Sequence, residues 1–216
     1  MYSLWWGFMH QPSLFNEQSS DSIRLKDAEL EYWPVFLSDK EAGGYLSKLL
    51  KVTDWQTETI RIAGVERLVP RLTAWYGEPG ASYSYSGVLH HPTAWNQELL
   101  TLKKQIEQCC GESFNSALLN LYRNGKDSVA WHSDDEPELG QQPIIASLSL
   151  GAPRSFQLKH KKDPHLRHKL TLTSGSLLVM RGDTQQCWSH QVPKEPAVTE
   201  PRINITFRNI VTNSNQ

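Results

Sequence analysis

Two histidines and one aspartate are the residues of this chain best suited to chemistry. His132 and Asp134 form an H-x-D triplet, and His190 lies downstream in a Cys-Trp-Ser-His segment. Two imidazoles and a carboxylate can occupy one face of Fe(II), leaving three positions for an organic cosubstrate and oxygen. After His190 come Arg202 and Arg208, whose guanidinium groups can hold a dicarboxylic acid through paired N–H bonds. Together these residues predict a metal centre beside a carboxylate site.

Strand geometry bears on whether this triplet can address one ion. Residues i and i+2 of a strand point the same way, so His132 and Asp134 share a face while Ser133 faces elsewhere. His190 must come from a distant strand, which a jelly roll can bring to the same mouth. Alone the triplet is weak, because the chain has 8 histidines and a chance match is the more frequent explanation. Cys187 is not an expected ligand, since it faces away from His190 and thiolate suits zinc better.

The last strong β-type segment adds weight because its polar residues alternate. One side carries polar and the other apolar residues: Arg202, Asn204, Thr206 and Arg208 against Ile203, Ile205 and Phe207. Four polar side chains buried without partners would be costly, so they need a charged ligand or water. The alternative is an edge strand whose polar face meets solvent. Asn120 and Tyr122 are predicted to share one face of a strand adjacent to that of His132.

Composition indicates a folded single domain. The chain has 216 residues, of which 38% are hydrophobic and 21% charged, so a packed core is expected and global disorder is not. The net charge of -1 does not indicate nucleic-acid binding, which would need a local basic patch.

Cysteine use and the N-terminal segment bear on the cellular compartment. The three cysteines form no disulfide framework and favour a reducing environment. The N-terminal apolar run is short and lacks Lys or Arg before Arg24, which argues against a signal peptide. No stretch approaches the length of a membrane span. We expect an intracellular protein with no membrane partner, cytoplasmic if bacterial and nuclear if eukaryotic.

Two helices are predicted in the first half of the chain. Ser38 and Glu41 match a capping box that opens a helix running to about Lys51. A second helix is predicted where apolar residues recur at helical spacing ahead of Gly111, a natural stop: Trp95, Leu99, Leu102, Ile106 and Cys109.

Short β-rich runs dominate from residue 116 onward. They fall at residues 117–123, 128–132, 144–150, 155–159, 169–172, 177–181 and 202–210. Many short strands at even spacing predict a sandwich, jelly roll or barrel with the helices packed outside. We expect a mainly β fold with flanking helices (α+β) around a double-stranded β-helix. The expected organisation is a poorly ordered tail over 1–22 and one catalytic domain over 23–216, with helices and hairpins in 23–112 and the jelly-roll core in 113–216.

These motifs resemble the AlkB family of Fe(II)- and 2-oxoglutarate-dependent dioxygenases, which repair alkylated nucleobases. The resemblance covers roughly residues 60–211 and rests on Asn120-Leu121-Tyr122-Arg123-Asn124, Trp131-His132-Ser133-Asp134-Asp135-Glu136, Ile145-Ala146-Ser147-Leu148-Ser149-Leu150-Gly151, His190 and the Arg-x-Asn-x-Thr-x-Arg pattern at 202–208. It implies oxidative dealkylation of bases of the 1-methyladenine and 3-methylcytosine type in DNA, with RNA a further candidate. 2-Oxoglutarate and O2 would become succinate and CO2, and the hydroxylated N-alkyl group would leave as an aldehyde.

The resemblance also implies roles for individual residues. His132, Asp134 and His190 would ligate Fe(II), and with Arg202 they form the implied catalytic set. The implied 2-oxoglutarate contacts are Asn120, Tyr122, Arg202, Thr206 and Arg208. Among these, Arg202 would lie close to the cosubstrate and the site carboxylates, whereas Arg208 would pair with the far carboxylate of 2-oxoglutarate.

The target base must leave its stack, because a base inside a duplex cannot reach a buried metal. The resemblance matches Tyr83 and Tyr85 to aromatic residues of the base pocket, where they would stack on the base. Asp135 and Glu136 would hydrogen-bond the exocyclic group of the base. The alternatives are ordinary strand packing for the tyrosines and a solvated turn for the acidic pair.

A hairpin tip bears on strand preference. Relatives that prefer double-stranded DNA carry a bulky apolar wedge where this chain has Ile62, Ala63 and Gly64, upstream of Arg71. All four residues are implied substrate contacts. The small Ala63 side chain fills the gap left by a flipped base poorly, which favours single-stranded substrates over duplex. The alternative is that Ile62 intercalates instead.

A basic stretch is the candidate for phosphate contact. Residues 159–162 read Lys-His-Lys-Lys and residues 167–169 read Arg-His-Lys, on either side of a turn at Asp163 and Pro164. This hairpin tip could contact phosphates of a nucleic acid. The alternative is a solvated loop.

Two rival functions stay open at the level of sequence. One is the same chemistry on another substrate, either an RNA modification or a protein side chain. The other is a non-catalytic jelly-roll binding module, which would be free to lose Asp134, Arg202 or Arg208; all three are present. We expect a monomer whose partner is nucleic acid with alkylated bases.

Overall fold

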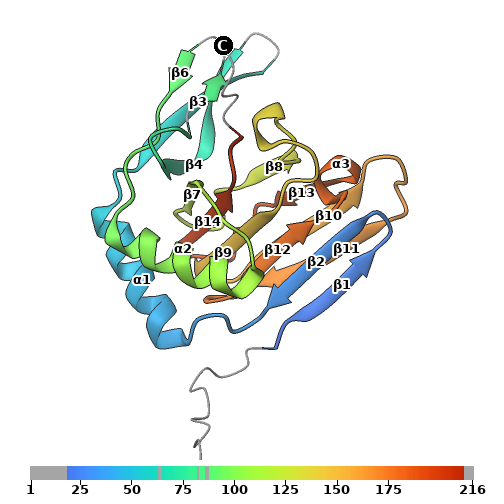
Figure 1. Cartoon of the computed structure of the whole chain (residues 1–216), viewed down its shortest axis with the longest axis horizontal. Helices are drawn as coiled ribbons and strands as arrows, with labels where there is room; N and C mark the ends of the chain where they lie inside the picture. Colours follow the sequence, from blue (N-terminus) through green and yellow to red (C-terminus); the bar gives the residue numbers. More distant parts are fainter. Residues whose placement is uncertain (1–18, 63–64, 82, 86–87, 212–216) are drawn as a thin grey trace, which may run out of the picture.

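A computed structural model describes residues 19–62, 65–81, 83–85 and 88–211. Two antiparallel sheets form its core (Figure 1). The larger has the strand order β1 (Asp21–Leu25), β2 (Ala28–Trp33), β12 (Leu177–Arg181), β9 (Ile145–Gly151), β14 (Arg202–Arg208), β7 (Ser116–Tyr122), β4 (Val65–Gly77) and β3 (Gln56–Ile62). The smaller has the order β11 (Arg167–Leu172), β10 (Arg154–His160), β13 (Trp188–Val192) and β8 (Val129–His132). The short strands β5 (Tyr83–Tyr85) and β6 (Val88–His90) pair with each other. The predicted class, mainly β with flanking helices and a jelly-roll core, is confirmed.

Both predicted helices are present and cover one face of the larger sheet (Figure 1). Helix α1 (Asp39–Val52) opens with the predicted capping box: the Ser38 hydroxyl accepts from the Glu41 amide, and the Glu41 carboxylate accepts from the Ser38 amide. Helix α2 (Gln97–Cys110) ends at Gly111, whose φ of 70° is left-handed and suits glycine. Within the described residues, no helix has the length and apolarity needed to cross a membrane.

The larger sheet is buried on both sides, which strand β12 illustrates. Leu177 and Val179 pack with the helices, while Leu178 and Met180 pack against the smaller sheet. Removing a buried leucine from such a position costs on the order of 2–5 kcal/mol. The apolar cores therefore hold the two sheets and the helices in fixed order, and the polar residues between the sheets sit on a rigid frame.

Strand β14 lies in the middle of the larger sheet, between β7 and β9. The predicted alternation is present, because Ile203, Ile205 and Phe207 belong to the helix-side core. The opposite face is also covered: Asn204 and Thr206 are buried and hydrogen-bonded to each other. The alternative of a solvent-facing edge strand is therefore wrong.

Three features differ from the sequence-based expectation. Strand β7, with Asn120 and Tyr122, is not adjacent to β8, because residues 123–128 cross from one sheet to the other and β8 pairs with β13. Asp21 and Ser22, placed in the tail, begin strand β1, which with β2 extends the larger sheet. The chain after β12 forms a short helix, α3 (Thr184–Cys187), within the half expected to be all strand.

Candidate active site

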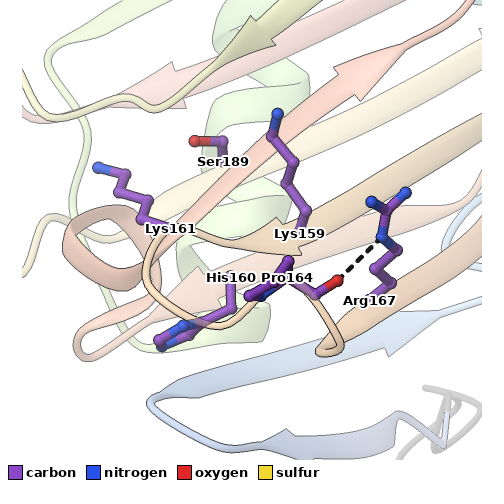
Figure 2. Close-up of a pocket in the computed structure, with 6 residues that line it drawn as sticks. All are labelled: Lys159, His160, Lys161, Pro164, Arg167 and Ser189. Carbon is purple, nitrogen blue, oxygen red and sulfur yellow. Dashed lines mark hydrogen bonds between the residues drawn. The ribbon is translucent and has the colours of Figure 1, made fainter.

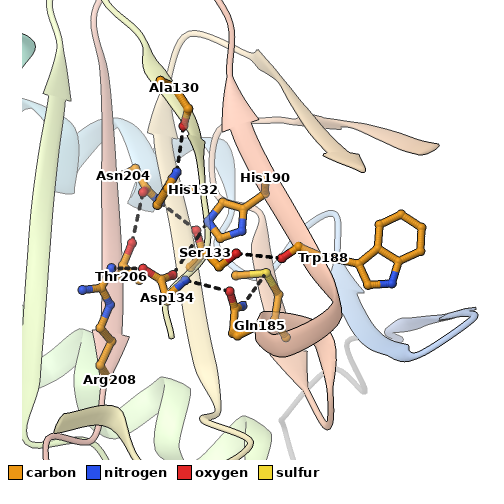
Figure 3. A network of polar contacts seen from close by, with 12 residues as sticks. Ala130, His132, Ser133, Asp134, Gln185, Trp188, His190, Asn204, Thr206 and Arg208 are labelled. Atoms are coloured by element: carbon orange, nitrogen blue, oxygen red, sulfur yellow. Dashed lines mark hydrogen bonds and ion pairs between the residues drawn. The ribbon is translucent and has the colours of Figure 1, made fainter. Parts of the chain in front are cut away.

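The two histidines and the aspartate of the predicted metal site come together between the sheets. His132 on β8 stands directly opposite His190 on β13, with ring centroids 4.3 Å apart. Asp134 follows β8 and faces both rings (Figure 3). Ligand atoms of the three residues lie within 4.8 Å of one another. The antiparallel pairing thus brings together residues distant in sequence, in an arrangement that can hold one metal ion on one face.

Hydrogen bonding and burial leave both imidazoles ready to act as ligands. Nδ1 of His132 lies 2.9 Å from the Ala130 carbonyl oxygen. Because a carbonyl only accepts, Nδ1 must carry the proton and Nε2 keeps its free lone pair. For His190, burial lowers the pKa to about 4, opposed by the nearby Asp134 carboxylate. The ring is therefore neutral at neutral pH, as metal ligation requires.

Asp134 is fixed from three directions and is only 3% exposed. Its Oδ1 accepts from the Arg208 guanidinium at 2.5 Å, and its Oδ2 faces Nε2 of His190 at 3.8 Å. Its backbone amide donates to the Gln185 side-chain oxygen at 3.0 Å. Burial alone would raise the pKa of Asp134, but Arg208 and the two histidines hold it below its usual value. The carboxylate is thus ionised, with one oxygen directed toward the histidines.

Arg202 lies at the opposite end of β14 and is 1% exposed. Its Nη2 donates to the Ser149 hydroxyl at 2.9 Å, whereas its Nε and Nη1 donate to no described residue. Its guanidinium lies 5.2 Å from the centroid of the Tyr122 ring. Burial lowers the pKa of Arg202, and no carboxylate among the described residues forms an ion pair with it. A buried cation with two unused donors fits the carboxylate of an anionic ligand.

The two arginines stand differently from the expectation drawn from the resemblance. Arg202 was expected near the site carboxylates, but Arg208 is the residue that contacts Asp134. Arg208 was expected to bind the far carboxylate of the cosubstrate, but its guanidinium is paired with Asp134 and leaves one buried nitrogen unused, whereas Arg202 leaves two. The alternation of β14 told which face both residues occupy, but not which end lies beside the histidines.

The other expected cosubstrate residues form a polar lining on β7 and β14. Asn120 Oδ1 accepts from Arg71 Nε at 2.6 Å, so Arg71, expected to contact substrate, bonds a residue expected to bind the cosubstrate. The Thr206 hydroxyl donates to Asn204 Oδ1 at 3.1 Å, and Asn204 in turn donates to the Ser147 hydroxyl at 2.7 Å. These hydrogen bonds fix the positions of the side chains on the face that carries Arg202 and Arg208.

The expected substrate residues are only partly described. Asp135 is exposed, and its carboxylate accepts from Lys161 Nζ at 2.9 Å. Glu136 is exposed as a whole residue and precedes the short 3-10 helix η1 (Pro137–Leu139). Its carboxyl group is the less accessible part, and desolvation of that group raises its pKa. The backbone of Tyr83 and Tyr85 forms β5, but their side chains lie outside the described residues. The same holds for the side chain of Ile62 and for Ala63 and Gly64 entirely.

A second group of potential ligands, Asp27, His160 and Cys187, does not fit a metal ion. Nδ1 of His160 accepts from the amides of Lys162 and Asp163, at 3.2 and 3.0 Å. Nε2 must then carry the ring proton, and it lies 3.2 Å from the Asp27 carboxylate. A protonated nitrogen cannot coordinate a metal. Cys187 is not among the ligand atoms grouped around His190, but it ends helix α3 and does not lie on the strand of His190 as the alternation argument assumed.

The sequence analysis did not identify the residues that hydrogen-bond Asp134, Arg202 and Asn204 and so fix their positions. Gln185, fully buried on α3, holds the Asp134 amide and donates to the Met180 sulfur. Ser147 and Ser149 on β9 bond Asn204 and Arg202. The serines had a readable signal, because they alternate with leucines on a strand, as Asn204 and Arg202 alternate with isoleucines. Gln185 had none, since its role depends on a contact across 51 residues.

Comparison with known proteins agrees with this geometry. A family model described as the 2OG-Fe(II) oxygenase superfamily matches residues 29–208. The solved structure of OsALKBH1 aligns with a TM-score of 0.64 and 19% sequence identity, covering 87% of this chain and 100% of that chain. At that identity the likeness bears on the fold alone.

Sequence relatives carry AlkB names. Alpha-ketoglutarate-dependent dioxygenase alkB homolog 3 is 49% identical over 186 residues in Bos taurus and 47% over 187 residues in Homo sapiens, each match covering 82% of this chain. The chain spans 64% and 65% of the length of these two relatives. DNA oxidative demethylase ALKBH2 of Homo sapiens is 35% identical over 199 residues, covering 88% of this chain and 76% of that protein. The chain therefore belongs to the AlkB family of the 2OG-Fe(II) oxygenase superfamily, whose cofactors are Fe(II), 2-oxoglutarate and O2.

Proposed function

We propose that this protein removes N-alkyl groups oxidatively from nucleobases of the 1-methyladenine and 3-methylcytosine type in DNA, with RNA as a second substrate to be tested. The observation that carries the proposal is the grouping of His132, Asp134 and His190, with Arg208 paired to Asp134 and with Arg202 buried with unused donors on the same strand face. The names of the relatives, a dioxygenase and a DNA oxidative demethylase, support the substrate class.

The two ends of the site have different proposed roles: one end binds the iron and the other binds the far carboxylate of 2-oxoglutarate. When bound, Fe(II) and 2-oxoglutarate supply the oxidation of the alkyl carbon by O2, with succinate and CO2 as co-products. We assign the iron to Nε2 of His132, Nε2 of His190 and Oδ2 of Asp134, an assignment supported by the proton on Nδ1 of His132 and by the approach of Oδ2 to His190. We assign the far carboxylate of 2-oxoglutarate to the unused donors of Arg202. Arg208 keeps Asp134 ionised and oriented, which exchanges the roles first expected for the two arginines.

Succinate release tests this function directly. Purified protein is loaded anaerobically with Fe(II), then exposed to O2 and 2-oxoglutarate with single-stranded oligonucleotides that contain 1-methyladenine, 3-methylcytosine or no lesion. We expect succinate and an aldehyde in equal amounts with the methylated strands, and little succinate with the unmodified one. Equal succinate release with all three strands would remove the nucleobase as substrate. Absence of turnover with any substrate would remove the enzymatic function.

We also propose that the hairpin between β10 and β11 contacts the phosphates of the substrate strand. A surface pocket of about 420 Å³ lies there, lined by Lys159, His160, Lys161, Pro164, Arg167 and Ser189 (Figure 2). The three cations can attract phosphates on a chain whose net charge is only -1. The buried His160 ring points away from Lys159 and Lys161 and bonds Asp27, so it is not part of the contact.

Lys161 connects this hairpin to the metal site. Its Nζ donates to Asp135 and to the Gln185 carbonyl, at 2.9 and 2.8 Å. Asp135 directly follows the candidate ligand Asp134, and Gln185 holds the Asp134 amide. Ser189, which lines the pocket, directly precedes His190. A strand whose phosphates lie in the pocket therefore passes beside the segments that carry two of the three ligands.

Substitution of the hairpin cations tests the phosphate contact. Lys159→Ala combined with Arg167→Ala should raise the KM for a methylated strand about five-fold and reduce its salt dependence. Lys48→Ala is the matched control, because Lys48 is exposed on α1, on the helical side of the larger sheet. The proposal fails if both proteins show the wild-type KM and salt slope.

We further propose a preference for single strands, which rests on the small Ala63 in the sequence between β3 and β4. Ile62 and Val65 are paired, and Ala63 lies between them in the sequence, outside the described residues. Ala63→Phe supplies a wedge and should raise activity on duplex relative to single strand by about three-fold. Both rates are measured on the same methylated strand, free and annealed. An unchanged ratio would count against the role of Ala63.

A further inference from the structure

Two buried guanidinium groups lie close to the Tyr122 ring. The Arg202 group is 5.2 Å from the ring centroid, and the Arg154 group is 5.4 Å from it. All three side chains are nearly or fully buried: Tyr122 is 2% exposed and each arginine 1%. Two like charges around one buried ring are unfavourable unless each one is compensated, and the Arg154 charge contributes, after burial, to the lowered pKa of Arg202.

The protein compensates the two charges very differently. Arg154 Nε donates to the Glu195 carboxylate at 2.9 Å, and its Nη2 donates to the carbonyls of Asp127 and Pro193 at 2.9 and 2.6 Å. Arg202 donates to the Ser149 hydroxyl and leaves two nitrogens unused. Arg154 is thus fully engaged with the protein, whereas Arg202 is left for a ligand.

Arg154 also joins the two loops beside Tyr122. Asp127 lies in the loop of residues 123–128 that follows Tyr122, and Pro193 and Glu195 lie in the loop of residues 193–201 that leads to Arg202. The loops are packed closely, because the Glu195 amide donates to the Gly125 carbonyl at 2.8 Å. A Cβ added at Gly125 would lie 1.8 Å from the Glu195 carbonyl oxygen. The Arg154 side chain is therefore a clamp in a segment with no room to shift.

We infer that Arg154 is a positioning residue for the cosubstrate: it holds the Tyr122 ring, and through the ring the Arg202 guanidinium, in the orientation that receives the carboxylate. The inference rests on the proposed role of Arg202. The hydrogen bonds of Arg154 go to Glu195 and to backbone carbonyls, and none goes to a candidate metal ligand or to Arg202. Its effect should therefore appear in the affinity for 2-oxoglutarate and not in the affinity for the metal.

Calorimetric titration of the Fe(II)-loaded protein with 2-oxoglutarate under anaerobic conditions tests this inference without turnover. Arg154→Met keeps the volume of the side-chain stem and removes its charge and donors. We expect the Kd for 2-oxoglutarate to rise about ten-fold, as for other residues that orient a ligand-binding group. The Kd for the metal should change less than about two-fold, and Arg154→Lys should recover part of the affinity.

Arg123→Met is the matched control. Arg123 is exposed and pairs with Asp127, in the same loop, but lies on the outside of it. This variant should keep the wild-type Kd for 2-oxoglutarate. A folded Arg154→Met protein with a lowered Tm and an unchanged Kd would overturn the inference and leave Arg154 with a purely structural role.

A second variant decides the matter if Arg154→Met does not fold. Glu195→Gln keeps Arg154 but removes its charge partner, and should raise the Kd for 2-oxoglutarate about three-fold. An unchanged Kd in that protein would overturn the inference. Failure of the proposed function is distinguishable, because the wild-type protein itself would then bind no 2-oxoglutarate.

Discussion

The two ends of the site treat buried charge in opposite ways. At the metal end, Asp134 is paired with Arg208, His190 is neutral, and Nδ1 of His132 is held by the Ala130 carbonyl. At the other end, Arg202 is 1% exposed, and within the described residues no carboxylate pairs with it. Strand rise puts the Cα atoms of the two arginines about 20 Å apart along β14, with the Arg208 guanidinium at Asp134 and that of Arg202 at Ser149.

This difference teaches which parts of the site are complete without ligand. The metal end is preorganised by protein contacts: Arg208 and Gln185 hold Asp134, and a backbone carbonyl fixes His132. The Arg202 end retains the cost of an uncompensated buried cation, which an anionic ligand removes on binding. Loss of a residue at the metal end should therefore affect the metal first, and loss of Arg202 should affect the cosubstrate first.

The largest effect is expected from Asp134→Ala. It removes a candidate ligand and leaves the Arg208 guanidinium without its partner. Succinate release should fall at least about 100-fold, and the iron content after desalting should fall with it. Asp54→Ala, at an exposed position after α1, is the control and should keep both. Full iron content in the Asp134→Ala protein would remove Asp134 from the ligand set.

Arg202→Met and Arg208→Met should separate the two ends. We expect Arg202→Met to raise the Kd for 2-oxoglutarate about 100-fold, equivalent to about 2.7 kcal/mol, with little change in metal affinity. Arg208→Met should weaken metal binding more than Arg202→Met does, because Asp134 loses the cation that keeps it ionised. Both constants are measured by anaerobic titration. The opposite pattern would restore the roles first expected for the two arginines.

The Tm should rise when 2-oxoglutarate binds, because the ligand carboxylate pairs with the buried charge of Arg202. At about 100 times its Kd, 2-oxoglutarate stabilises the native state by about 2.7 kcal/mol, which raises the Tm by several degrees for a chain of this size. The same cosubstrate concentration should leave the Tm of Arg202→Met nearly unchanged. A wild-type protein whose Tm does not respond, although titration shows binding, would mean that 2-oxoglutarate binds the unfolded chain as well.

A further effect concerns the pH dependence of the stability of the metal-free protein. The pKa of His190 is lowered from 6.5 to about 4, so the unfolded chain binds more protons between these values. Stability is then full above pH 6.5 and falls as the pH drops toward 4, by up to about 3 kcal/mol from this group. Urea unfolding of wild type and His190→Asn in chelator checks this. Equal pH slopes in the two proteins would show that His190 is not buried neutral.

Local features of the fold were readable from the sequence. The capping box at Ser38 and the stop at Gly111 each depend on a few neighbouring residues, and both are present. The alternation of β14 depends only on strand period, so the face shared by Arg202 and Arg208 was also predictable. The same logic applies to His132 and His190, whose types and context pointed to one site.

What the sequence could not supply depends on contacts between distant segments. The strand of Tyr122 was expected beside that of His132, but a crossing loop puts them in different sheets. Which arginine lies near Asp134 depends on the direction in which β14 runs past β8, and no local pattern encodes that direction. Gln185 and Arg154 act through partners 51 and 41 residues away, so neither had a signal in its own neighbourhood.

Mass spectrometry of a single-stranded oligonucleotide with one 1-methyladenine tests the central claim most directly. The strand is incubated with the iron-loaded protein, O2 and limiting 2-oxoglutarate, alongside the Asp134→Ala protein. We expect one methyl group to be lost from the strand for each succinate formed in substrate-coupled turnover, and no loss with Asp134→Ala. A strand that keeps its methyl group while the wild-type protein consumes 2-oxoglutarate would contradict nucleobase dealkylation as the function of this site.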